Sequence, residues 1–141
     1  MPKKVFPGRF AAAVDISNFV VAEAEAAGFN DKEIYAVELA LDEAVANIVE
    51  HAYGAEDVGE IVCSCDVSGG VLRIELEDEG KPFDPAAVPE PKVGAPLEEL
   101  GPGGAGLFLM RKMMDEVKFD FGPQKGTRLT MIKRKAKRGS Y

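Results

Sequence analysis

The sequence has two cysteines, a single histidine and no tryptophan, and it contains no long apolar run. A membrane-spanning helix needs about 20 consecutive apolar residues, so we expect no membrane span and no membrane partner. The first nine residues are basic, but no apolar segment follows them. We therefore expect no signal peptide and a cytoplasmic protein. At 141 residues, 46% hydrophobic and 29% charged, the chain is expected to form one domain over residues 1–141.

The spacing and number of the cysteines argue against a disulfide and against a structural zinc site. Cys63 and Cys65 are separated by one residue, and a disulfide across that spacing is strained. Two sulfurs and one distant histidine, His51, do not complete a tetrahedral zinc site. We interpret the cysteines as two small buried thiols on one face of a strand.

Charge is unevenly distributed along the chain. The net charge is −7, yet residues 133–141 carry five basic and no acidic side chains. The rest of the chain carries 12 basic and 24 acidic residues, so we expect no direct binding to nucleic acid. The basic end is interpreted as a solvated tail that aids solubility, and contact with an acidic partner is the alternative.

Two periodicities divide the chain. Apolar residues recur at helical spacing in the first third, where Asn30 or Asp31 is a candidate cap with Glu33 in the first turn. Period-two alternation follows. The Pro- and Gly-rich residues 84–105 predict a long loop, a length that is usually functional or disordered. The predicted order is helices over 9–28 and 30–53, a hairpin over 61–76, the loop, a helix over 106–115 and a hairpin over 117–131. This order predicts an α+β two-layer sandwich.

A carboxylate and an amide lie one turn apart on the second predicted helix. Glu43 and Asn47 are neighbours at i, i+4, roughly opposite the apolar stripe that contains Val37, Leu41 and Val45. An amide oxygen can ligate magnesium, and a carboxylate can deprotonate an attacking oxygen. A solvated helix face is the structural alternative.

Two further segments carry polar or glycine signals. Asp78 ends an alternating strand just before Gly80, where a carboxylate can accept a hydrogen bond from the amino group of a purine; a simple strand-ending turn is the alternative. Residues 101–106 fit G-x-G-x-x-G, but no βαβ unit surrounds them. Glycines that open a helix can present backbone N–H groups to phosphate, and a flexible linker is the alternative reading.

The order of these motifs resembles the four boxes of the Bergerat, or GHKL, ATP-binding fold. The closer resemblance is to the small bacterial anti-sigma factor serine kinases of the RsbW and SpoIIAB type, since residues 41–53 are similar to their motif E-A-x-x-N-x-x-x-H-A-Y. The resemblance implies a two-layer α+β sandwich, with a mostly antiparallel sheet covered on one face by helices. The matching residues are Glu43…Asn47, Asp78-x-Gly80-x-Pro82-Phe83, Gly104-x-Gly106-Leu107-x-Leu109 and Gly126-Thr127.

The resemblance also implies roles for single residues. Asn47 would ligate Mg²⁺, and Glu43 would be the base that takes the proton of a serine hydroxyl. Asp78 would bind the adenine amino group, with Gly80 leaving room for the ring. Thr127 and a water would help to hold the base.

The remaining assignments concern the phosphates and the loop. Gly104 and Gly106 would direct backbone N–H groups to the phosphates, and residues 84–105 would form a lid over ATP. Phe83 and Leu107 are assigned to the nucleotide site on the same resemblance. His51 is expected to have a structural role.

The resemblance implies a function as well as a site. The family members are ATP- and Mg²⁺-dependent serine kinases that phosphorylate a STAS-domain anti-anti-sigma protein and sequester a sigma factor, usually as homodimers. A non-catalytic ATP-binding partner-switching module is the alternative, and so is a kinase whose substrate controls something other than a sigma factor. A histidine kinase is disfavoured because the only histidine, His51, lies inside the motif itself.

Overall fold

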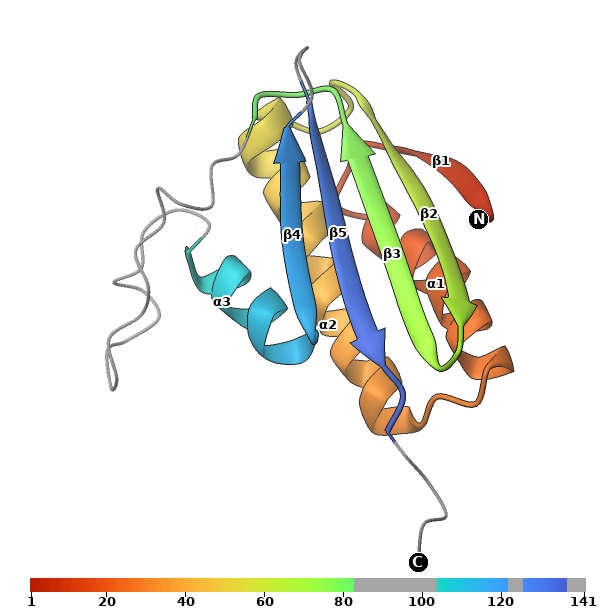
Figure 1. Cartoon of the computed structure of the whole chain (residues 1–141). Helices are drawn as coiled ribbons and strands as arrows, with labels where there is room; N and C mark the ends of the chain where they lie inside the picture. Colours follow the sequence, from red (N-terminus) through yellow and green to blue (C-terminus); the bar gives the residue numbers. More distant parts are fainter. Residues whose placement is uncertain (83–103, 122–125, 137–141) are drawn as a thin grey trace, which may run out of the picture.

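A computed structural model describes residues 1–82, 104–121 and 126–136 (Figure 1). Five strands form one sheet in the spatial order β1-β2-β3-β5-β4, and every neighbouring pair is antiparallel. The helices lie on one face of this sheet, which confirms the predicted α+β two-layer sandwich. The elements are β1 Lys3–Pro7, α1 Ala12–Ala26, α2 Asp31–Asn47, η1 Ile48–Tyr53, β2 Glu60–Ser68, β3 Val71–Asp78, α3 Gly104–Met113, β4 Glu116–Phe121 and β5 Thr127–Arg134.

Helix α2 begins at a capping box. The Asn30 side chain accepts from the Glu33 N–H at 2.7 Å, and the Glu33 carboxylate accepts from the Asn30 N–H at 2.7 Å, which satisfies two N–H groups that the helix cannot bond itself. The single helix predicted over residues 30–53 changes character after Asn47: it continues as a wider π-helical turn, η1, and ends at Gly54, whose φ is +78°. No helix in the described ranges is long and apolar enough to cross a membrane.

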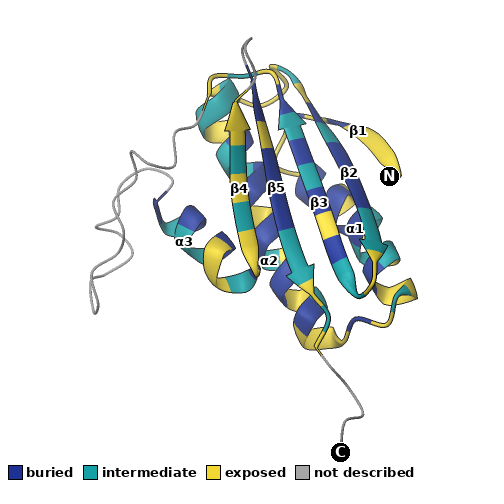
Figure 2. Ribbon diagram, in the orientation of Figure 1, coloured by how far each residue is buried: buried dark blue, intermediate teal, exposed yellow. Residues whose placement is uncertain are grey.

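Both predicted hairpins are present. Gly69 and Gly70, with φ of +57° and +76°, form the turn between β2 and β3, the backbone conformation that a tight hairpin requires. Strand β5 pairs with β3 on one side and β4 on the other. Along β3, buried residues alternate with intermediate or exposed ones (Figure 2), so one face of the sheet enters the core and the other is more open to solvent.

The core lies between the sheet and the helices. Burying each large aliphatic side chain contributes about 1.5–3 kcal/mol relative to exposure. The predicted helical stripe is buried, and so are both cysteines, as expected; burial raises the pKa of the Cys63 thiol to about 12. The largest fully buried side chains include Ile16, Val20, Val37, Leu41, Val45, Ile61, Leu72, Ile74, Leu76, Leu107, Met110 and Met131.

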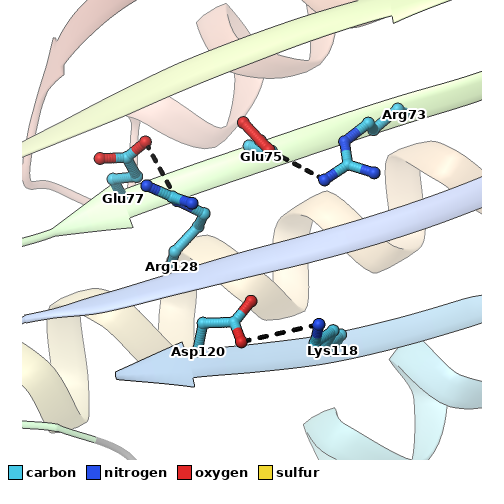
Figure 3. A network of polar contacts seen from close by, with 6 residues as sticks. All are labelled: Arg73, Glu75, Glu77, Lys118, Asp120 and Arg128. Carbon is cyan, nitrogen blue, oxygen red and sulfur yellow. Dashed lines mark hydrogen bonds and ion pairs between the residues drawn. The ribbon is translucent and has the colours of Figure 1, made fainter. Parts of the chain in front are cut away.

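The helix-free face of the sheet is polar. Figure 3 shows three ion pairs on this face: Arg73–Glu75 within β3 at 3.2 Å, Arg128–Glu77 between β5 and β3 at 3.5 Å, and Lys118–Asp120 within β4 at 3.8 Å. Exposed pairs of this kind contribute at most about 1 kcal/mol each. They mark this face as solvated and place the core and the helices on the other side.

Strand β1 was not predicted, because residues 1–9 read only as a basic terminus. The strand pairs with β2, with Phe6 opposite Ile61. Phe6 is buried and packs edge-on against Phe19, with ring centroids 6.0 Å apart. One buried aromatic in five residues gives no period-two pattern, so only the long-range pairing with β2 reveals the strand.

The prediction of a solvated basic tail is wrong for its first residues. Lys133 and Arg134 belong to β5. The Lys133 ammonium donates to the Met113 carbonyl at the end of α3 at 2.7 Å, and the Lys135 ammonium donates to the Ala27 carbonyl at the end of α1 at 3.1 Å. These lysines satisfy carbonyls at helix C-termini, where a cation is favourable. Residues 137–141 lie outside the described residues.

Candidate functional site

Helices α2 and α3 meet at the predicted carboxylate–amide pair. A Cβ on Gly106 would lie 2.7 Å from the Glu43 Oε2 and 3.6 Å from the Asn47 Oδ1. Glycine at this position therefore lets the first turn of α3 approach both side chains directly. The structure brings together Glu43, Asn47 and Gly106, as the sequence predicts, and the solvated-face alternative does not hold because α3 covers this part of α2.

The electrostatic surroundings of Glu43 favour the protonated carboxyl. Partial burial is the largest cause and raises the pKa of Glu43; the nearby charges of Asp42 and Glu50 raise it further. A carboxylate whose pKa is raised is a stronger base, since it binds a proton more tightly when it receives one.

Asp78 is buried at the end of β3, with 8% of its surface exposed. Burial raises the pKa of its carboxyl to about 6, although the Gly80 N–H, which donates to Oδ1 at 2.9 Å, acts in the opposite direction. A buried carboxylate with so little compensation is unfavourable for the isolated fold. It is suited to accept hydrogen bonds from a bound ligand.

Thr127 faces Asp78 across the sheet as its pairing partner in β5. Among the described residues, two buried side-chain polar atoms have no hydrogen-bond partner: the Thr127 Oγ1 and the Asn47 Nδ2. Both residues line the same cavity as Asp78. Buried polar groups without partners are rare, so their convergence on one cavity points to a ligand site.

This cavity is small. It measures about 20 Å³, room for roughly one water molecule, so a purine ring can enter only if the lining side chains move apart. A groove of about 740 Å³ lies beside it and shares Ala52 and Asp78 as lining residues. The cavity is lined by Ala44, Asn47, Ile48, Ala52, Asp78, Met110, Phe119, Thr127 and Leu129.

Two glycines allow close backbone approach around Asp78. A Cβ on Gly80 would lie 2.4 Å from the Ala52 carbonyl oxygen of η1, and the next residue, Lys81, donates its N–H to that oxygen at 2.7 Å. Gly80 therefore lets the chain after β3 rest on η1, a reason for glycine that the sequence did not suggest. Gly126 has a φ of +127°, and a Cβ there would lie 2.5 Å from the Asp78 carbonyl oxygen.

The N-terminus of α3 provides N–H donors beside Glu43 and Asn47. Gly104, Gly106 and Leu107 are buried in its first turn. The first four N–H groups of a helix have no partner within the helix, and they favour anions such as phosphate. The predicted glycine-led helix start is thus present next to the predicted base and metal ligand.

Some predicted residues lie elsewhere. Phe83 and residues 84–103 of the predicted lid lie outside the described residues, and the last two lid positions, 104 and 105, are the first residues of α3. His51 is not among the residues that line the cavity. Its Nε2 lies 3.8 Å from the Glu50 Oε2.

The side chains at this site are compatible with a magnesium ion that is bound together with nucleotide phosphates. In the described ranges no group of three or more His, Cys, Asp or Glu side chains could hold a metal ion. Magnesium commonly takes only one or two protein ligands and completes its shell with substrate phosphates and water. An amide oxygen at Asn47, beside the N-terminus of α3, is compatible with this kind of site.

Sequence reasoning missed the apolar lining of the cavity. Phe119 was identified only as part of an alternating strand, and Met110 only as part of a helix. Their positions in β4 and α3 are settled by tertiary packing, and the sequence carries no separate signal for them.

The family described as histidine kinase-like ATPase domain matches residues 6–133. The chain therefore belongs to this family of ATP-binding domains and, within it, to the RsbW-type serine-protein kinases. The serine-protein kinase RsbW of Listeria monocytogenes serotype 4a (strain HCC23) is 33% identical over 114 residues, which cover 78% of this chain and 71% of the relative. The RsbW of Bacillus cereus (strain G9842) is 38% identical over 95 residues, 64% of this chain and 58% of the relative.

Solved structures agree on the fold. The crystal structure of the RsbU and RsbW domains of Rv1364c from Mycobacterium tuberculosis matches all of this chain with a TM-score of 0.68 at 22% identity, and the chain spans 34% of that protein. The nucleotide-free catalytic domain of the histidine kinase ThkA matches 96% of this chain, with a TM-score of 0.55 at 14% identity, and the chain covers 98% of that domain.

Proposed function

We propose that this chain is an ATP- and Mg²⁺-dependent serine kinase that phosphorylates a STAS-domain anti-anti-sigma protein and, as a homodimer, also sequesters a sigma factor. The observation that carries the proposal is the convergence of Asp78, Thr127 and Asn47 on one cavity, two of them through buried polar atoms without partners. Family membership supports the ATP chemistry. The two protein partners are inferred from the resemblance to the RsbW-type anti-sigma factor kinases, the kinase group to which the relatives belong.

Each residue has one task in the proposed reaction. Asp78, as the carboxylate, accepts from the amino group of adenine, and Thr127 supports the base through its hydroxyl. Asn47 provides an amide oxygen to the magnesium ion, which neutralises phosphate charge when it is bound. The N–H groups of Gly104 and Gly106 bind phosphate oxygens. Phosphoryl transfer depends mainly on such positioning and charge stabilisation.

Glu43 is proposed as the base that accepts the proton of the attacking serine hydroxyl. It lies one helical turn from Asn47 and contacts the first turn of α3, so a hydroxyl held near the terminal phosphate would be within its reach. Its raised pKa favours proton acceptance. Phe83 and Leu107 are proposed to contact the nucleotide, and residues 84–105 to cover it.

The proposal is tested by labelling with γ-labelled ATP. The purified chain is incubated with magnesium and a cell extract of its source organism, beside the Glu43→Ala variant. We expect wild type alone to label one small protein on serine, identified by mass spectrometry as a STAS-domain protein. If ATP binds but nothing is labelled, the chain is instead a non-catalytic ATP-binding module.

A further inference from the structure

The aromatic ring of Tyr53 is seated between two glycines. A Cβ on Gly59 would lie 2.5 Å from its ring carbons, and a Cβ on Gly8 would lie 3.2 Å from its Cδ2. The Gly8 N–H in turn donates to the Gly59 carbonyl at 2.8 Å. Any side chain at Gly59 would displace the ring. The position of the Tyr53 ring therefore depends on the absence of a side chain at this glycine.

The hydroxyl of Tyr53 stands where the β2–β3 ladder ends. The last paired residues are Val62 and Glu77, and the antiparallel register places Glu60 opposite Glu79 two residues further along. The Tyr53 hydroxyl donates to the Glu60 carbonyl at 2.5 Å and accepts from the Glu79 N–H at 3.1 Å. The side chain therefore bridges the two chain segments just beyond the last β2–β3 pair, at the residue that directly follows Asp78.

The same bridge fastens the end of β3 to η1. Lys81 donates to the Ala52 carbonyl at 2.7 Å, and Gly80 packs against Ala52. Residues 79–81 are thus held by the last two residues of η1, which continues the helix that carries Asn47 (Figure 1). Asp78 is held on its other side by pairing with Thr127.

We propose that Tyr53 is a positioning residue for base recognition: its hydroxyl bridge fixes the end of β3 so that the Asp78 carboxylate faces the adenine amino group. This inference rests on the proposed role of Asp78. Without the hydroxyl, the Glu79 N–H loses its partner and residues 79–81 are held by fewer contacts. Asp78 then loses its fixed direction, while the phosphate-binding end at α3 is unchanged.

The test compares two nucleotides that differ at the recognised group. Inosine triphosphate carries a carbonyl oxygen where ATP carries the amino group, so a well-placed carboxylate favours ATP. We expect Tyr53→Phe to weaken ATP binding about three- to tenfold, the scale of one lost hydrogen bond, with much less effect on inosine triphosphate. The ratio of the two affinities therefore falls. The control is Tyr35→Phe, a change at an exposed tyrosine of α2, which should leave both affinities unchanged.

Other outcomes separate this inference from the proposed function. Equal weakening of both nucleotides, or an unchanged ratio, overturns the positioning role while ATP binding by wild type stands. Absence of ATP binding by wild type overturns both. If Tyr53→Phe fails to fold, Gly59→Ala is used instead, since its Cβ displaces the ring; the same fall in the ratio is expected. Faster amide exchange at Glu79 in Tyr53→Phe tests the bridge without nucleotide.

Discussion

The two ends of the sheet differ in how far their buried polar groups are hydrogen-bonded. At the end where the β2–β3 turn lies, the buried Glu33 carboxylate accepts from the Asn30 N–H and, at 2.6 Å, from the Ala136 N–H. At the same end, the Lys135 ammonium donates to the Ala27 carbonyl and the Lys135 backbone N–H donates to the Gly70 carbonyl. At the opposite end, Asp78 is buried with a raised pKa, and the Thr127 Oγ1 and the Asn47 Nδ2 have no partner among the described residues.

The difference separates structural polar groups from those available to a ligand. A buried polar group without a partner destabilises the fold by about 1–3 kcal/mol. Buried polar groups have hydrogen-bond partners at the end of the sheet near the β2–β3 turn. At the opposite end, where we propose that ATP binds, some of them have none among the described residues. Substitutions at the nucleotide end should therefore lose function without losing stability, and substitutions at the other end should do the reverse.

The largest expected effect is at Glu43. We expect Glu43→Ala to keep ATP binding but to lower the phosphoryl-transfer rate by about 10²-fold or more, the scale of a general base. The measurement is single-turnover transfer at saturating ATP, beside Glu38→Ala, an exposed glutamate on the same helix. Equal rates for Glu43→Ala and wild type would remove Glu43 as the base.

The next effect is the pH dependence of ATP affinity. The ionised carboxylate of Asp78 is a strong hydrogen-bond acceptor for the adenine amino group, whereas the protonated carboxyl is a weak one. The pKa of this group is about 6. Affinity should therefore be constant above pH 7 and fall about tenfold for each unit below pH 6. Titrations across this range are made with wild type and, as the control, with Asp78→Asn. Glu43, whose pKa is also raised, and the nucleotide itself take up protons in both proteins, so the difference between the two profiles reports Asp78. A wild-type profile with the same slope as the variant contradicts the assignment.

A smaller effect is expected at Thr127. Valine has the same shape as threonine but no hydroxyl, so Thr127→Val removes an unpartnered buried group. We expect the ligand-free protein to gain about 1 kcal/mol of unfolding free energy, and ATP to bind several-fold more weakly. Denaturant unfolding and nucleotide titration measure the two effects. A loss of stability in the ligand-free variant would mean that the hydroxyl is satisfied within the fold.

The smallest effect lies at the other end of the sheet. Asn30→Ala removes the cap of α2 and should lower the unfolding free energy by about 1 kcal/mol, with ATP affinity unchanged. Chemical unfolding and the same titration test this. A fall in ATP affinity equal to that of Thr127→Val would remove the contrast between the two ends.

Much of the fold follows from local patterns. The apolar stripe of α2, a cap at Asn30 or Asp31 and the two alternating hairpins are encoded within short windows of sequence and were predicted; the structure shows that the cap is Asn30. β1 and the lysine caps of α1 and α3 were missed, since Phe6, Lys133 and Lys135 find their partners far along the chain. The π-helical turn after Asn47 also left no periodic signal.

The candidate site was predictable as a set of motifs but not as a cavity. Glu43, Asn47, Asp78 and Gly106 were identified from residue type and order, and the structure brings Glu43, Asn47 and Gly106 close together. The positions of Phe119 and Met110 around the cavity depend on packing between elements. The Tyr53 bridge depends on two glycines that are 51 residues apart in the chain.

The central claim is that the nucleotide end keeps a buried carboxylate for its ligand at the expense of stability. Burial raises the pKa of Asp78 from 3.8 to about 6, so the ligand-free fold loses stability from this group as pH rises between these values. At pH 8 the penalty is about 2–3 kcal/mol. The most direct test measures ATP affinity and ligand-free unfolding of Asp78→Asn at pH 8. We predict weaker ATP binding together with higher stability; unchanged affinity, or lower stability, would contradict the account.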